Sequence, residues 1–593
     1  MKPTTPSRRA LWLTLLASLG LVAALFAACS SATITETTPT PTRTPRPPTP
    51  TVTLTPSPTP TPAWPVTVFV PEGLPAPVAG MLNTALAAHP DLLAPASSAE
   101  AADVQVVLNP AAALRTNPGP DVTPLAEWTY AVVAPFPTLT DEVSWADVAS
   151  SWSVTPTGHF AGQTLLVTAD TAATLAATMG DPASGAVEVV SAEEIVQRAW
   201  DTLPAIRLSA HDEAWAIVPF DQLEPRWKVL RVDGGSVLDK GLDVAGYPLV
   251  VRIGATGLAR GVTKLQELLA EQAPLAVEGS VTSVLLTNRD PAKMTVVVMT
   301  GVTALSRATA MRMERHGMTY PAQDIRDWLV GADITHVSNE VSFAENCPPP
   351  ANYTTMVFCS SPRYIELLED VDVDVVELTG NHLLDWGLGA MQLSLTMYDT
   401  RNIPYFGGGW NLAQAQTPLT LTHGVHTFGF VGCNPVGPRS DWATEDLPGA
   451  APCDYDLLDV QIRQMRERDI IPIVTLQYWE FYQYEPTPQQ RAEFRALAEA
   501  GAIIVSGSQA HQPQGFDFHA GAFIHYGLGN LFFDQMWSLE TRQEFLDRHI
   551  FYDGRHISTE VLTAILEDYA RPRPMTDEER EVLLRAAFAA SGW

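Results

Sequence analysis

Histidine, carboxylate and amide side chains follow apolar runs at several points in the second half of this chain. "GSQAHQPQG" comes directly after the apolar run "AIIV" and contains His511, while "TGNHLLDWG" contains Asn381, His382 and Asp385. An imidazole next to a carboxylate can transfer protons near neutral pH. We therefore interpret His382 as the best candidate general acid or base, with Asp385 orienting it, and His511 as a further candidate catalytic residue.

Further polar loops follow the other apolar runs in order along the chain. Glu340 in "SNEVSF" and Glu480 in "QYWEFY" supply carboxylates. Amide side chains recur at the same kind of position and can hydrogen-bond a polar substrate without a metal ion; they are Asn339, Asn381, Gln477, Gln509 and Asn530. Because open α/β sheets place their sites at the carboxyl ends of their strands, this series of loops predicts one shared site.

The elements that position these loops alternate between strands and helices. From Met294 to Asp534, buried-type runs such as "MTVVVM", "IIPIVTL" and "AIIVSG" are separated by amphipathic stretches such as "PTPQQRAEFRALAEAG". From Trp64 to about Ser280, β-rich runs such as "VTVFV", "VQVVL" and "AWAIVPF" also alternate with helix-like stretches. This pattern predicts an α/β fold for each region.

The second region resembles the capsule synthesis protein CapA family, also called the poly-gamma-glutamate biosynthesis protein family. "TGNHLLDWG" matches the family's N-H-x-x-D-x-G loop, "GSQAHQPQ" its G-x-H-P-H loop, and "YGLGNLFFD" its Y-s-L-G-N-F-x-F-D strand. The resemblance implies a fold similar to the calcineurin-like metallophosphoesterases, an α/β sandwich. It also implies a role at the cell envelope in making, exporting or attaching capsular polymer.

Several positions depart from the metal ligands that the resemblance implies. Sites of the metallophosphoesterase type hold one or two cations that acidify a bound water. This chain has Val302 where the family has an acidic residue, and Gln477 and Gln509 where it has histidines. An amide is uncharged and is a poor partner for a transition metal. The departures favour a partly degenerate site that binds or guides polymer and leave open whether the protein is an enzyme.

The alternative is a metal-dependent phosphoesterase, or a polymer hydrolase or transferase, with its ligands redistributed. The divalent metal would be Mn or Mg. Its candidate ligands are Glu340, Glu480, His382 and His511.

The first region resembles periplasmic solute-binding proteins of the phosphate-binding type. The resemblance rests on "YAVVAPFPTLTDEVSWADVASSW" and "EAWAIVPFDQL", and the glycine- and serine-rich anion loop of such proteins is not evident. Trp215 and Trp227 are candidates to line a cleft, although isolated aromatic residues more often belong to a core. A small ligand bound in residues 64–280 is a further hypothesis, in which the second region acts as a scaffold.

The N-terminus has the layout of an export signal. A basic start precedes the apolar stretch Leu11–Ala28, and "LFAAC" resembles the bacterial lipobox, whose lipidated cysteine would be Cys29. The alternative is an uncleaved anchor helix, because the apolar stretch is close to the minimum for a bilayer span. Both interpretations place the folded chain outside the cytoplasm, tethered to the membrane. The Thr- and Pro-rich segment that follows predicts an extended spacer.

Beyond Cys29 the chain has an even number of cysteines, which in an exported protein favours disulfides over metal thiolates. Three connectivities are possible. We prefer Cys347–Cys359 and Cys433–Cys453, because each pair closes a short loop that contains proline.

The excess of acidic over basic residues argues against nucleic acid as a partner. The 593 residues include 66 acidic and 36 basic side chains, and the net charge of −30 would repel nucleic acid. We expect an anionic or polar cell-surface polymer as the partner and a lipid anchor as the link to the membrane. The predicted segments are an export signal at 1–29, a linker at 30–63, a solute-binding-protein-like region at 64–280, a CapA-like region at 288–534 and a C-terminal helical extension at 535–593.

Overall fold

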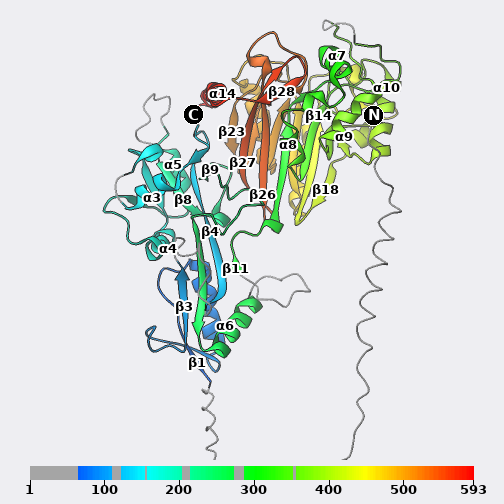
Figure 1. Cartoon of the computed structure of the whole chain (residues 1–593). Coiled ribbons are helices and arrows are strands. Elements are labelled where there is room, and N and C mark those ends of the chain that lie inside the picture. The colour runs from blue at the N-terminus through cyan, green and yellow to red at the C-terminus, as the bar shows by residue number, and fades with distance from the viewer. Residues whose placement is uncertain (1–63, 110–121, 154–155, 204–213, 273–285, 351–354) are drawn as a thin grey trace, which may run out of the picture. The chain divides into compact units, whose positions relative to one another are not determined.

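The computed structural model describes residues 64–109, 122–153, 156–203, 214–272, 286–350 and 355–593 (Figure 1). All of them belong to the compact unit Ala63–Trp593. The expected export signal, Cys29 and the Thr/Pro spacer lie outside the described residues. Within the described ranges, every helix is too short or too polar to cross a membrane.

The first region is built on an 11-stranded sheet. The main path runs in the order β2-β1-β3-β10-β4-β8-β6-β7, which corresponds to Leu93–Pro95, Val66–Phe69, Val104–Asn109, Val250–Gly257, Thr123–Pro135, Ala214–Pro219, Thr164–Val167 and Val187–Val189. Beside this path lie β5 (Glu142–Val143), β9 (Trp227–Val232) and β11 (Leu286–Thr287). The first half of β4 pairs with β10 and its last residues pair with β8 and β9, so β4 connects the two halves of the sheet.

The core of the first region lies between this sheet and its helices. The helices are α2 (Ala76–Ala88), α3 (Trp145–Ser153), α4 (Ala169–Met179), α5 (Ile195–Trp200) and α6 (Ala259–Gln272). Trp215 and Trp227 are fully buried in this core, and the ring of Trp215 stacks on that of Phe160 at 3.7 Å. These tryptophans are therefore core residues and do not line a cleft.

The second region contains two large sheets. The 9-stranded sheet follows the order β16-β15-β14-β12-β26-β27-β28, which corresponds to Tyr405–Phe406, Val375–Glu377, Ile334–Asn339, Met294–Thr300, Gln543–Tyr552, Arg555–Glu567 and Arg571–Pro574. Two short strands, β13 (Val302–Thr303) and β25 (Asn530–Phe532), extend it. The 6-stranded sheet follows the order β18-β19-β21-β22-β24-β23, which corresponds to Leu419–His423, His426–Cys433, Ile471–Gln477, Ile504–Ser508, Ala522–His525 and Phe516–His519.

The two sheets pack face to face with helices on their outer faces. In β12, Val297 and Met299 lie in the core between the sheets, while Val298 lies under the helices. This alternation follows from the opposite directions of successive strand side chains. The 9-stranded sheet is covered by α7 (Arg307–His316), α8 (Arg326–Val330), α9 (Ile365–Asp370) and α10 (Leu388–Arg401), and the 6-stranded sheet by α12 (Tyr455–Arg466) and α13 (Pro488–Ala500). The α/β class and the sandwich arrangement expected from the sequence are confirmed.

The C-terminal segment differs from the expected helical extension at 535–593. Strands β26, β27 and β28 occupy most of it and complete the 9-stranded sheet, as Figure 1 shows. Helix α14 (Asp577–Ser591) is the helix that the sequence indicates, and it begins with a capping box between Thr576 and Glu579. Polar residues within β26 and β27, such as His549 hydrogen-bonded to Thr559 at 2.8 Å, interrupt the apolar pattern by which strands are recognised.

The first and second regions share an aromatic contact. The ring of Phe136, which directly follows β4, lies 5.3 to 6.0 Å from five aromatic rings of the second region. These rings belong to Phe516, Phe518, Phe523, Phe588 and Trp593. One side chain of the first region is thus part of the core of the second.

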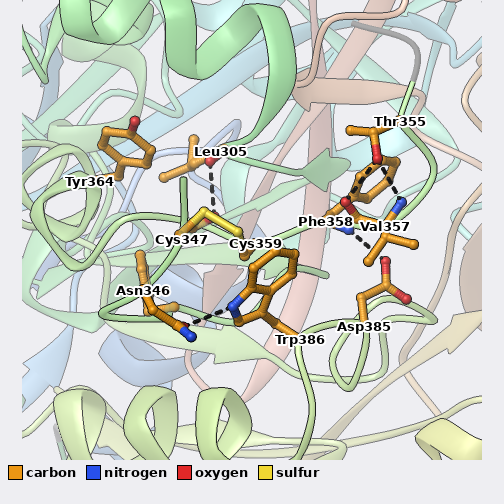
Figure 2. The surroundings of a disulfide bond; sticks show 12 residues. Leu305, Asn346, Cys347, Thr355, Val357, Phe358, Cys359, Tyr364, Asp385 and Trp386 are labelled. Atoms are coloured by element: carbon orange, nitrogen blue, oxygen red, sulfur yellow. Dashed lines mark hydrogen bonds between the residues drawn. A yellow bond between two sulfur atoms is a disulfide. The ribbon is translucent and has the colours of Figure 1, made fainter. Parts of the chain in front are cut away.

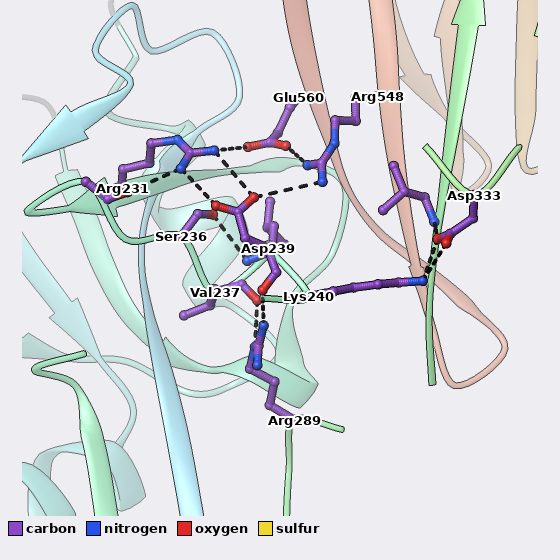
Figure 3. A network of polar contacts seen from close by, with 12 residues as sticks. Arg231, Ser236, Val237, Asp239, Lys240, Arg289, Asp333, Arg548 and Glu560 are labelled. Atoms are coloured by element: carbon purple, nitrogen blue, oxygen red, sulfur yellow. Dashed lines mark hydrogen bonds and ion pairs between the residues drawn. The ribbon is translucent and has the colours of Figure 1, made fainter. Parts of the chain in front are cut away.

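A charged network borders this aromatic contact. Figure 3 shows Arg231 and Asp239 of the first region linked to Arg548 and Glu560 of the second. A cavity of about 460 Å³ lies beside the network. Its basic side chains are each paired with a carboxylate; they are Lys228, Arg231, Arg548 and Arg580. The Arg580–Asp141 pair joins the two regions, whereas the other three pairs each lie within one region.

Candidate functional site

The polar loops of the second region meet where strands of its two sheets end. Gln477 ends β21 and pairs in register with Ser508, which ends β22. Glu340 directly follows β14, and a bridge between Val341 and His382 brings the "TGNHLLDWG" loop next to it. Gly380 is required here, because a Cβ atom at this position would lie 2.4 Å from the Cα of Glu340. The structure therefore brings loops from separate strands together.

Gln477 lies at the centre of this arrangement. Its Nε2 lies 3.2 Å from Oε2 of Glu340 and 3.2 Å from Oδ1 of Asn381, and it also donates to Oε1 of Gln509. Its Oε1 accepts a hydrogen bond from Oγ of Ser508 at 2.5 Å. A neutral amide group thus occupies the point on which oxygens from three other loops converge. We call these residues, together with His382, Asp385 and Asp441, the polar cluster.

The structure places His382 and Asp385, the candidate acid–base pair, in hydrogen-bond contact. Nδ1 of His382 lies 2.7 Å from Oδ2 of Asp385, and the side chains are 15% and 17% exposed. Burial lowers the pKa of His382, but the hydrogen bond to Asp385 and the charges of nearby carboxylates outweigh it, so the pKa lies above its usual value. The imidazole is therefore positioned to hold and donate a proton near neutral pH.

The Cys347–Cys359 disulfide lies next to this pair. The backbone N–H of Phe358, the residue before Cys359, donates to Oδ2 of Asp385 at 2.8 Å (Figure 2). The ring of Phe358 lies 4.2 Å from that of His382. The predicted pairings Cys347–Cys359 and Cys433–Cys453 are both confirmed. The Cys347–Cys359 disulfide therefore restrains the loop that contains Phe358. Phe358 holds the carboxylate of Asp385, which in turn orients the ring of His382.

Asp441 is a member of the cluster that the sequence did not reveal. It lies in the turn Arg439–Asp441, several residues after the end of β19, and its side chain is buried. Burial raises the pKa of Asp441 to about 6, and the nearby charge of Asp385 adds to this effect. The strand-end signal fails here because Asp441 lies well beyond the end of β19, within the loop that the Cys433–Cys453 disulfide closes.

His511 lies between the side chains of Asn530 and Glu480. Its Nδ1 lies 2.8 Å from Oδ1 of Asn530, and Asn530 in turn donates to the backbone oxygen of Thr541 at 3.1 Å. Its Nε2 lies 3.8 Å from Oε1 of Glu480, whose side chain is 43% exposed. His511 itself is buried. Asn530 is therefore engaged in holding this histidine.

Two further side chains near the cluster have internal partners. Nδ2 of Asn339 donates to the hydroxyl of Tyr398 at 2.7 Å, within the core. Arg307, another residue that sequence reasoning missed, forms a buried ion pair with Asp534. The guanidinium carbon of Arg307 lies 4.9 Å from the ring centroid of Phe358 and 4.7 Å from that of Phe533. Arg307 thereby packs against the same Phe358 that contacts Asp385.

The described side chains around the cluster do not form a ready-made metal site. In the described part of the chain, no group of three or more His, Cys, Asp and Glu side chains is arranged to hold one. His382 and His511 each direct Nδ1 to a neighbouring oxygen, which leaves Nε2 as the ring atom that could bind a metal, and Val302 is an apolar strand residue. Glu340 is 1% exposed, and burial raises the pKa of its carboxyl.

Comparison with known proteins connects these loops to one family. A family model described as "Bacterial capsule synthesis protein PGA_cap" matches residues 296–535. "PGA biosynthesis protein CapA" of Bacillus subtilis (strain 168) is 27% identical over 192 residues, which cover 32% of this chain and 50% of that protein. "Capsule biosynthesis protein CapA" of Bacillus anthracis is 25% identical over 301 residues, which cover 49% of this chain and 71% of that protein.

The solved structures that match this chain are only weakly similar to it. An ABC-type phosphate transport receptor from Vibrio cholerae has a TM-score of 0.25 at 11% identity and covers 35% of this chain and 93% of that one. A putative 5'-nucleotidase from Staphylococcus aureus has a TM-score of 0.30 at 12% identity and covers 50% of this chain and 58% of that one. These scores carry no argument about function. Over residues 296–535, the chain is similar to the bacterial capsule synthesis proteins of the PGA_cap family.

Proposed function

We propose that the protein acts at the cell envelope in the biogenesis of a capsule-type surface polymer, and that its polar cluster binds or guides the polymer. The observation that carries this proposal is the position of Gln477, whose amide group is surrounded by oxygens of Glu340, Asn381 and Gln509. Amides both donate and accept hydrogen bonds, so they suit a polar chain that must be held and released. The match of residues 296–535 to a capsule synthesis family supports the assignment to polymer biogenesis.

The proposed location is outside the cytoplasm, with attachment through a lipid on Cys29. Two disulfides support this location, because disulfides persist in oxidising compartments. Mass spectrometry of the mature N-terminus tests the anchor. A diacylglyceryl group on Cys29 is the expected result, and an intact Met1 would contradict it.

The proposed role in biogenesis is tested in the cell that encodes the protein. Deleting the gene is expected to reduce surface polymer, measured by its chemical quantification on washed cells. Complementation with the wild-type gene should restore the polymer, whereas the double variant Asn381→Ala/Gln477→Ala should not, at equal protein abundance. Unchanged surface polymer in the deletion strain would rule out the proposed role.

The His382–Asp385 pair favours a second candidate function, hydrolysis or transfer on the polymer. A protonated imidazole 2.7 Å from its orienting carboxylate can serve as a general acid. In a metal-dependent form of this chemistry, Glu340, Glu480, His382 and His511 would be the ligands of Mn or Mg. Elemental analysis of the protein and aryl phosphate turnover with Mn²⁺ test it: turnover that is lost in His382→Ala would favour the enzyme, and its absence with no bound metal would favour the binding protein.

A further inference from the structure

Exposed aromatic side chains stand beside the polar cluster. Trp479 and Tyr482 lie in the loop after β21 and are 51% and 45% exposed, and Trp537 lies in the loop after β25 and is 61% exposed. The rings of Tyr482 and Trp537 meet edge to face at 5.9 Å, and Tyr482 stacks over His511 at 6.4 Å. We call Trp479, Tyr482 and Trp537 the aromatic rim. Large aromatic rings left in water next to polar groups are typical of recognition surfaces.

Carboxyl groups outnumber basic groups at the rim and the cluster, although the cluster also contains the imidazole of His382, which is paired with Asp385. Glu480 lies within the rim loop itself, and Asp385 and Asp441 lie in the adjacent cluster. Arg307 is paired with Asp534, and its guanidinium group packs against the rings of Phe358 and Phe533. Arg439, next to Asp441, is exposed and lies over the ring of Trp442 at 5.7 Å. A chain with a carboxylate on every unit would meet more carboxyl groups than guanidinium groups here, which is unfavourable.

The cluster also has acceptors that need a donor. Oε1 of Glu340 and Oδ2 of Asp441 are buried and have no hydrogen-bond partner among the described residues. A buried acceptor without a partner destabilises the folded protein, because it has lost its hydrogen bonds to water. A hydroxyl group can donate to such an oxygen, whereas a carboxylate ligand can only accept.

We propose that the polar cluster and its aromatic rim bind an uncharged, hydroxyl-rich chain, a neutral glycan segment, in preference to a polyanion such as poly-γ-glutamate. The inference rests on the proposed function and names its ligand class. Each part of the surface has a role: the rim rings stack on the C–H faces of sugar rings, the amides of Asn381 and Gln509 hydrogen-bond hydroxyl groups, and the carboxyl groups accept from hydroxyls and repel anions.

The test measures binding of the full folded chain to defined probes at physiological salt. Cellohexaose and chitohexaose represent neutral chains, and poly-γ-glutamate represents the polyanion. We expect saturable binding of at least one neutral oligosaccharide by titration calorimetry, and no binding of poly-γ-glutamate. The replacements Tyr482→Ala and Trp537→Ala should each lower the affinity for the oligosaccharide by about tenfold, because a stacking surface is lost.

Trp64→Ala is the matched control, because Trp64 is 39% exposed but lies in the first region. It should leave oligosaccharide binding unchanged, and thermal unfolding should show that all variants remain folded. Oligosaccharide binding that survives both rim variants would overturn the assignment of this site. Binding of poly-γ-glutamate alone, or of neither class of probe, would overturn the ligand class. None of these binding results changes what the deletion strain shows. If the inference fails and the deletion strain still loses surface polymer, the proposed function stands.

Discussion

The two α/β regions use aromatic and polar residues in opposite ways. In the first region, Trp215 and Trp227 are enclosed in the core, and the basic groups of the neighbouring cavity are paired with carboxylates. In the second region, amides and carboxylates converge on Gln477, and the aromatic rim remains exposed. Fold class is therefore no guide to which region carries the site. We therefore place the proposed site in the second region, where side chains from several loops converge.

The strongest test of the comparison removes Trp215. We expect Trp215→Ala to destabilise the first region by about 3–5 kcal/mol, because a fully buried ring stacked on Phe160 is lost. Polymer binding by the folded fraction should be unchanged. Urea unfolding followed by oligosaccharide titration measures both quantities. A selective loss of affinity in a folded Trp215→Ala protein would show that the first region contributes to the site.

Removing the Cys347–Cys359 disulfide should affect both stability and the site. The double variant Cys347→Ser/Cys359→Ser opens a loop with a sequence separation of 12, which costs about 3 kcal/mol. It should also lower the pKa of His382, because Phe358 no longer holds Asp385 in place. The matched control is Trp215→Ala in the first region, which should lose stability while the pKa of His382, followed by NMR, stays raised. Equal pKa values in the disulfide variant and in Trp215→Ala would contradict the positioning role of Phe358.

Replacing Gln477 tests the centre of the polar cluster. Gln477→Leu removes the donor shared by Glu340, Asn381 and Gln509, and we expect a loss of about 1–3 kcal/mol in the free energy of unfolding. Polymer binding should fall as well. Gln489→Leu, at an exposed helical position, serves as the control and should change stability by less than about 0.5 kcal/mol. Similar effects of the two replacements would show that the amide network is not a distinct unit.

Glu544 offers a pH-dependent test of the interior of the second region. Its carboxyl is fully buried without a partner among the described residues, and burial raises its pKa well above the usual value. The folded state therefore retains a proton that the unfolded state releases above its ordinary pKa, and stability is lost as the pH rises. Relative to Glu544→Gln, the wild type should lose up to about 1.4 kcal/mol per pH unit in that range. Parallel stability curves for the two proteins would contradict a neutral Glu544.

The smallest expected effect concerns the contact between the regions. Nζ of Lys240 lies 2.6 Å from Asp333, and both side chains are partly exposed. Because solvent screens such pairs, Lys240→Met should cost less than about 1 kcal/mol in calorimetry. A larger loss, or the separation of one unfolding transition into two, would show that this pair dominates the contact.

The sequence predicted those features of the candidate site that involve residues close together along the chain. His382 and Asp385 lie in one short loop, and their hydrogen bond follows from that spacing. The disulfide pairings were also predictable, because each closes a short loop. The α/β alternation indicated both regions correctly.

The remaining features depend on contacts between distant segments. Asp441 and Phe358 reach the His382 loop only through the fold, and neither follows a strand directly. The long strands β26 and β27 were missed because some of their polar residues pair across the sheet, which no local pattern records; examples are His549 with Thr559 and Arg548 with Glu560. The burial of Trp215 likewise depends on Phe160, a residue far from it in sequence.

The position of β12 in its sheet has a consequence for how the protein is made. β12 begins the second region, yet its antiparallel neighbour is β26, so Met294 pairs with Tyr552 and Thr300 with Leu546. During synthesis, β12 must remain unpaired along this edge until almost the whole chain has emerged. Such late, long-range pairing slows folding and leaves strand edges open to aggregation. Synthesis of the β26–β27 hairpin is therefore the step after which β12 is paired on this edge and no longer exposed to aggregation with other chains.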